Sequence, residues 1–145
     1  MDIILETSAV FFSALLSATL IPATSEAVLI ATVLNGDTNL WLLALIATFG
    51  NTAGAIINWA IGIFLSGLSK KSWFPVKKKM IVKAEDYFKK YGVWSLLFCW
   101  LPIIGDPLTL VAGYLKVPFA TFCLLVCVGK GARYFFIAQF FSGLW

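Results

Sequence analysis

The chain has 145 residues, of which 61% are hydrophobic and only 12% are charged. A soluble domain carries about a quarter charged residues, so this composition excludes an ordinary soluble domain and predicts a single membrane domain over residues 1–145. The net charge of +4 comes from one lysine-rich segment, which argues against a nucleic-acid partner. Because the chain has no histidine, a histidine-based triad and a zinc site lack their usual groups, and we expect no metal and no cofactor.

The first apolar stretch, residues 8–34, is interrupted by Pro22-Ala23-Thr24-Ser25-Glu26. Its halves, 8–21 and 26–34, are each shorter than the roughly 20 helical residues that span a bilayer. A re-entrant hairpin and a single kinked span both fit this pattern. Irregular backbone at membrane depth must be surrounded by protein or a water-filled cavity, so we expect Glu26 inside the bundle. The acidic N-terminus does not resemble a signal peptide, and we expect this segment to be retained.

Residues 40–67 follow a turn and are long enough to span the bilayer with tilt. Small and polar residues recur along this span at intervals of four, a pattern that lets another helix approach closely. These residues are Gly50, Gly54, Asn58 and Gly62. Asn51 and Asn58 also need hydrogen-bond partners inside the membrane, which makes both amides candidate substrate-binding groups.

The segment 69–91 is a basic amphipathic linker. Eight of the eleven basic residues lie between Lys70 and Lys90, and the positive-inside rule places this segment in the cytoplasm. Residues 77–91 predict a helix in the membrane interface, because apolar residues repeat with helical period and lysines occupy the other face. Such lysines attract anionic headgroups by about 1 kcal/mol each.

Residues 93–115 repeat the design of the first stretch. Two apolar halves, 93–101 and 108–115, flank a break that extends from Pro102 through Gly105 and Asp106 to Pro107. Pro107 is suited to the first position of the helix that follows. The last predicted span, 117–145, carries Lys130 and Arg133 in its middle.

The two broken segments predict an internal repeat. Pro22 and Pro102 each stand four residues before an acid and are 80 residues apart (102 − 22), while Gly50 and Gly129 each precede a polar residue and are 79 apart (129 − 50). Paired interrupted segments of this kind indicate a transporter site at a repeat interface. We expect repeats over about 8–68 and 92–145. They are inverted, with both termini periplasmic, if each broken segment is re-entrant; if 8–34 crosses fully, the N-terminus is cytoplasmic.

Four ionisable residues lie within apolar segments: Glu26, Asp106, Lys130 and Arg133. Each costs about 2.5–3.5 kcal/mol at the centre of a membrane helix, so we expect them to pair or to face water. A neutralised bundle interior would explain them structurally. In the functional alternative, Arg133 and Lys130 together bind an anion such as a phosphate. It gives Glu26 and Asp106 the role of proton coupling, because burial favours the protonated form of an acid.

The remaining polar residues considered are not expected to take part in a functional site. Tyr134 either stacks on a headgroup or packs against its neighbours, and packing is favoured. Asp2, Glu6 and Asp37 are expected on the solvated surface. We expect no enzyme, because the sequence offers no nucleophile and base in a supporting context.

The sequence resembles the DedA superfamily, also called SNARE-associated or VTT-domain proteins, and above all its short YqaA-type branch. The residues that carry the resemblance are Phe98-Cys99-Trp100-Leu101-Pro102, Gly105-Asp106-Pro107-Leu108-Thr109, Ala112-Gly113, Gly129-Lys130 and Arg133-Tyr134. The run from Pro22 to Leu29 resembles the first motif of that family, whose acid corresponds to Glu26. Many members carry arginines where this chain has Trp100 and Asp106, so the basic role would fall to Lys130 and Arg133.

The resemblance implies an all-α inner-membrane protein with two re-entrant hairpins that meet inside the membrane. It also implies transport of a lipid anion, such as a polyprenyl phosphate or a phospholipid, with membrane lipids as partners. Proton coupling rests instead on Glu26 and Asp106, and the sequence leaves the coupling ion open. A proton-coupled exporter of small solutes or cations, and a non-transporting scaffold, remain alternatives. The narrow interior of one such bundle makes a homodimer plausible.

Overall fold

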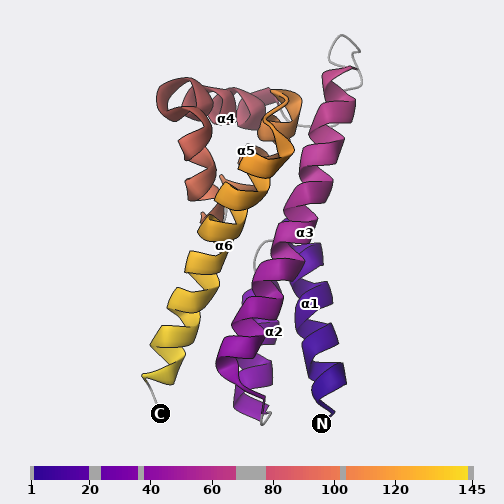
Figure 1. Cartoon of the computed structure of the whole chain (residues 1–145), viewed down its shortest axis with the longest axis vertical. Coiled ribbons are helices and arrows are strands. Elements are labelled where there is room, and N and C mark those ends of the chain that lie inside the picture. The colour runs from indigo at the N-terminus through magenta and orange to yellow at the C-terminus, as the bar shows by residue number, and fades with distance from the viewer. Residues whose placement is uncertain (1, 20–23, 36–37, 68–77, 102–103, 144–145) are drawn as a thin grey trace.

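The computed structural model describes residues 2–19, 24–35, 38–67, 78–101 and 104–143, and Pro22 and Pro102 lie outside these ranges. All regular secondary structure in the described ranges is helical, which confirms the all-α prediction (Figure 1). The elements are α1 (Ile3–Thr19), α2 (Thr24–Asn35), α3 (Leu40–Ser66), α4 (Lys78–Tyr91), the 3₁₀-helix η1 (Gly92–Trp100), α5 (Gly105–Tyr114) and α6 (Phe119–Ser142).

Two helices of the described chain are long and apolar enough to cross a membrane, Leu40–Ser66 in α3 and Phe119–Phe141 in α6. Both match the predicted spans to within a few residues. Asn39 sets the start of α3, because its side chain accepts a hydrogen bond from the backbone N–H of Trp41 at 2.9 Å. Pro118 stands immediately before α6, where a missing N–H costs nothing.

Helices α1 and α2 form an antiparallel hairpin. At its open end, the hydroxyl of Thr38 donates to the carboxylate of Glu6. At its closed end, Ser25 donates to Ser17 over 3.1 Å. The hairpin therefore begins and ends beside the start of α3. Helix α1 starts five residues earlier than expected, and Glu6 is only 2% exposed, so its predicted place on the solvated surface is wrong.

The 3₁₀-helix η1 and helix α5 form a second, shorter hairpin. The backbone N–H of Gly105 donates to Leu101 O at 2.9 Å and closes the connection. Helix α5 begins at Gly105. Asp106 and Pro107 therefore lie in its first turn, and our extension of the break as far as Pro107 is wrong because the helical hydrogen bonds start earlier.

The two hairpins occupy opposite halves of the bundle and pack on opposite halves of α3 (Figure 1). The second hairpin packs on α3 through a close approach of the α3 and α5 backbones. A Cβ atom on Gly62 would lie 2.1 Å from Leu110 O, and one on Gly113 would lie 1.9 Å from Trp59 O. Only glycine permits α3 and α5 to approach so closely. The predicted packing role of the small residues in α3 is confirmed at Gly62.

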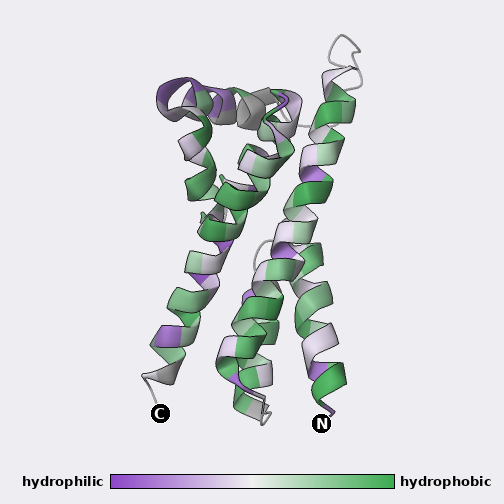
Figure 2. Ribbon diagram, viewed as in Figure 1, coloured by the Kyte–Doolittle hydropathy of each residue, from purple (hydrophilic) through white to green (hydrophobic). Residues whose placement is uncertain are grey.

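Two apolar cores form around the two hairpins. The first contains Ala47 of α3 and Ala138 of α6, and the second contains Ala55 of α3 and Val126 of α6. Between these heights the same helices bury polar groups. These are Thr48, Asn51, Thr52 and Lys130. The bundle is thus divided by a polar layer at mid-height, visible as purple and white bands on green helices in Figure 2.

Helix α4 matches the predicted amphipathic helix in its bounds and lies across one end of the bundle (Figure 1). It is the most hydrophilic helix in Figure 2. Phe88 anchors it, since this side chain is 8% exposed and belongs to the second apolar core.

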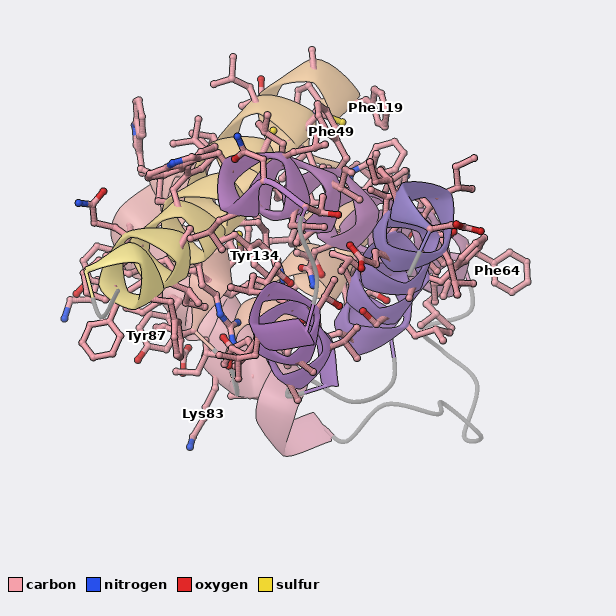
Figure 3. All side chains as sticks on the ribbon, turned by 90° about the horizontal axis from the view of Figure 1, so that it is seen from below. Phe49, Phe64, Lys83, Tyr87, Phe119 and Tyr134 are labelled. Carbon is pink, nitrogen blue, oxygen red and sulfur yellow. The ribbon has the colours of Figure 1, made fainter. Side chains whose placement is uncertain are left out.

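The outer surface of the bundle is apolar. Phe64, Leu124 and Phe136 are each more than 60% exposed, and Figure 3 shows Phe64 pointing away from the bundle while Tyr134 lies in its middle. Soluble monomers rarely expose apolar surface on this scale, so the surface fits contact with lipid.

Candidate functional site

Arg133 joins the two hairpins. Its Nε donates to Glu26 Oε1 at 2.7 Å, and its terminal Nη2 contacts the same oxygen. Its other terminal nitrogen, Nη1, donates to Trp100 O at 2.9 Å. Glu26 lies in the first turn of α2 and Trp100 is the last residue of η1. One guanidinium therefore contacts a residue of each hairpin, close to the point where the apolar sequence is interrupted. The Arg133 side chain is 16% exposed.

Lys130 forms a second ion pair one helical turn away. Its Nζ lies 3.2 Å from Asp106 Oδ1. The lysine side chain is 3% exposed, whereas the aspartate is 27% exposed. The four intramembrane charges thus form two acid–base pairs, as expected from the cost of leaving them alone in hydrocarbon.

The two predicted amides donate hydrogen bonds from α3 to the helices packed against it. Asn51 Nδ2 donates to Ala14 O at 3.0 Å and to Tyr134 Oη at 3.2 Å. Asn58 Nδ2 donates to the Thr109 hydroxyl at 3.3 Å, and that hydroxyl donates to Asp106 O at 2.7 Å. Both amides therefore support the site from α3.

Tyr134 takes part in the polar layer, which the expectation of simple packing missed. Its side chain is 1% exposed, and its hydroxyl lies 2.8 Å from Ser25 Oγ as well as bonding Asn51. Ser25 precedes Glu26, so this bond fixes the start of α2 against α6. The sequence carries a signal for this role: Tyr134 follows the intramembrane Arg133, and a buried phenol needs a hydrogen-bond partner.

Two buried oxygens of the layer have no partner in the described part of the chain: Asn51 Oδ1 and Thr52 Oγ1. Buried polar atoms of this kind are commonly satisfied by internal water.

A cavity of about 510 Å³ adjoins the Arg133–Glu26 pair. Trp100, Phe136 and Ile137 supply apolar lining, and the two charged side chains line it as well. A cavity lined by a cationic fork with its paired carboxylate and by apolar side chains suits a molecule with an anionic head and an apolar body.

The described residues contain no group of three or more His, Cys, Asp or Glu side chains that could hold a metal ion. The acids of the site are instead paired with bases.

Gly105 and Pro107 lie in the first turn of α5 beside Asp106. The other two predicted break residues, Pro22 and Pro102, fall outside the described residues.

Comparisons with known proteins agree on one family. The VTT domain model matches residues 21–143. The chain is 38% identical over 130 residues to inner membrane protein YqaA of Escherichia coli, covering 88% of this chain and 85% of the relative. It is 34% identical over 131 residues to a protein of Haemophilus influenzae, covering 86% and 80%.

A more distant relative has a functional name. Undecaprenyl phosphate transporter A of Staphylococcus aureus is 34% identical over 58 residues, which are 39% of this chain and 29% of the relative. No solved structure matches the chain.

Proposed function

This chain belongs to the VTT domain family of membrane proteins, also known as the DedA family, and from that premise we propose that it translocates a phosphate-bearing lipid across the bacterial inner membrane. The observation that carries the proposal is the position of Arg133. Its guanidinium lies between both hairpins and lines a cavity whose lining is apolar apart from Arg133 and Glu26.

The chemistry of Arg133 favours a phosphate headgroup. A guanidinium offers parallel N–H donors that match two oxygens of a phosphate, and it remains charged at all physiological pH values. In the structure these donors are occupied by Glu26 and by Trp100 O. A headgroup would take the place of the carboxylate, while its tail stays along Phe136 and Ile137 or in lipid.

We further propose that both hairpins are re-entrant and related by an inverted repeat. Helix α1 has 17 residues and α2 has 12, so at 1.5 Å per residue neither reaches the roughly 30 Å of the hydrocarbon core. The repeat is supported by equivalent packing. A Cβ on Gly50 would meet α1 at Phe11 O, and a Cβ on Gly129 would meet η1 at Leu97 O.

In this arrangement α4 lies in the cytoplasmic interface, and α1 begins and α6 ends on the periplasmic side. The orientation rests on the lysines of the linker 69–91 and the positive-inside rule. The two ion pairs would then lie near the midplane, where a substrate site at a repeat interface is expected.

Proton coupling would act through the acids. Protonation of Glu26 removes the charge that holds Arg133 and frees its donors for the headgroup. Asp106 would act in the same way on Lys130. The exchange of a carboxylate for a phosphate keeps the buried cations paired throughout, which avoids the several kcal/mol that an isolated buried charge costs.

The S. aureus relative is named for undecaprenyl phosphate, and we extend that substrate class to this chain because the phosphate of such a lipid would meet the guanidinium of Arg133.

The test is translocation of a fluorescent polyprenyl phosphate in proteoliposomes under two opposite pH gradients. We expect flipping by the native chain, its loss in Arg133→Ala, and no change in Lys116→Ala, because Lys116 lies after α5 on the surface. Native-level flipping in both Arg133→Ala and Glu26→Gln would refute the mechanism. Activity toward a small solute that depends on Asp106 and not on Arg133 would favour an exporter instead.

A further inference from the structure

A second cavity of about 530 Å³ lies at the corner where α4, η1 and the end of α5 meet. It shares no lining residue with the cavity at Arg133. We propose that this cavity holds the headgroup of a zwitterionic glycerophospholipid, one whose headgroup carries both a phosphate and an ammonium group. The proposal concerns a binding site at the membrane interface and does not depend on the translocation proposed above.

The charges of the cavity come from one face of α4. Glu85 and Lys89 both line it and stand four residues apart, which places their Cβ atoms about 5–6 Å from each other on a helix. Both residues are described, and the structure places no ion pair between them. The acid and the base are therefore available to a ligand, with Glu85 half-buried and Lys89 exposed.

A zwitterionic headgroup fits this pair in sign and in spacing. Its phosphate and its ammonium are separated by two carbons, so Lys89 can bind the phosphate while Glu85 binds the ammonium. An anionic headgroup without an amine would satisfy Lys89 but would bring its phosphate close to the Glu85 carboxylate. The carboxylate therefore acts against such lipids, as a repulsive group does in a specific site.

The rest of the lining is mainly apolar and partly exposed. Val93 and Leu115 line the cavity and are 37% and 47% exposed. Phe88 also lines the cavity and belongs to the second apolar core. Helix α4 lies across the end of the bundle (Figure 1), so a headgroup held by α4 would have its glycerol and upper acyl chain beside Val93 and Leu115.

Matched control residues are present on the same helix. Lys83 and Asp86 are exposed and do not line the cavity, and Figure 3 shows Lys83 pointing away from the bundle. Charge reversal at these positions changes the net charge of α4 as much as reversal at Lys89 and Glu85 does. Any effect of general surface charge will appear equally in both sets.

The experiment reconstitutes the full chain in vesicles of equal phosphatidylethanolamine and phosphatidylglycerol, extracts it in mild detergent and counts bound lipids by native mass spectrometry. Each variant is also made in the Arg133→Ala background, so that lipid held in the central cavity is subtracted. We expect a preference for phosphatidylethanolamine that falls about threefold in Glu85→Lys, the scale of one partly exposed ion pair. Lys89→Glu should reduce binding of both lipids.

Asp86→Lys and Lys83→Glu should leave the preference unchanged. The proposal is overturned if the native chain shows no preference for the amine lipid, or if the control reversals alter the ratio as much as Glu85→Lys does. A preference for phosphatidylglycerol that depends on Lys89 also overturns it and would identify a site for anionic lipids. Because the readout is binding and not flipping, none of these outcomes bears on Arg133.

Discussion

Lys130 and Arg133 lie one helical turn apart on α6, yet each is paired with an acid from a different hairpin. Lys130 binds Asp106 in the first turn of α5, and Arg133 binds Glu26 in the first turn of α2. Helix α6 therefore connects the two hairpins at the height of the polar layer. A movement of either hairpin relative to α6 must break or exchange one of these pairs.

The two partners of the second ion pair are not equivalent. Lys130 is 3% exposed and Asp106 is 27% exposed. Asp106→Ala leaves a buried ammonium without its acid and should destabilise the protein by about 3 kcal/mol, whereas Lys130→Met leaves a carboxylate that is only partly buried and should cost about 1 kcal/mol. Thermal unfolding in detergent measures both. Equal losses, or a larger loss in Lys130→Met, would contradict the assigned burial.

Tyr134→Phe removes one oxygen and two hydrogen bonds at the centre of the bundle. The loss leaves Ser25 and Asn51 without that partner, so we expect destabilisation of about 1–2 kcal/mol. Tyr87→Phe is the matched control, because Tyr87 is 37% exposed and points outward in Figure 3. Thermal unfolding compares the two, and a Tyr134→Phe variant as stable as Tyr87→Phe would refute the role of this hydroxyl.

Gly62→Ala should disturb the contact between α3 and α5. The new methyl group would lie 2.1 Å from Leu110 O, a backbone atom that cannot rotate away. We expect a loss of about 1–3 kcal/mol, as overpacking causes elsewhere. Gly131→Ala provides the control, since its methyl group would meet only Thr48 Cγ2 at an ordinary 3.5 Å. Similar melting temperatures for both variants would show that the helices are not packed as described.

The topology makes a prediction about labelling. Single cysteines at Asp2 and Gly143, in a chain whose native cysteines are replaced, should react with a membrane-impermeant maleimide added from the periplasm. A cysteine at Lys83 should react only after the inner membrane is opened. Labelling of Asp2→Cys from the cytoplasm alone would show that the first hairpin crosses the membrane, and would exclude the inverted repeat.

Features that depend on local composition could be predicted from the sequence. The span 40–67 and the amphipathic helix 77–91 agree with α3 and α4, because apolar length and helical period are properties of consecutive residues. The presence of four intramembrane charges likewise follows from the sequence, and their energetic cost predicts that they pair.

The identity of the partners was decided only by the tertiary structure. Residues at i and i+3 share a helix face, so the sequence indicates that Lys130 and Arg133 lie together. It does not indicate that Lys130 faces α5 while Arg133 faces α2, because this depends on how the hairpins dock on α6. Arg133 and Glu26 are 107 residues apart in the chain.

Contacts between distant parts of the chain also explain why Glu6 and Tyr134 differ from their predicted environments. Glu6 is polar and close to the N-terminus, so its sequence context predicts exposure. Its burial comes from Thr38, 32 residues later, which the hairpin brings beside it. Tyr134 acquires its role from Ser25, 109 residues earlier. Composition and period thus determined the membrane class and the elements of this protein, whereas helix docking decided which polar groups meet, because each needs a partner that only a distant part of the chain supplies.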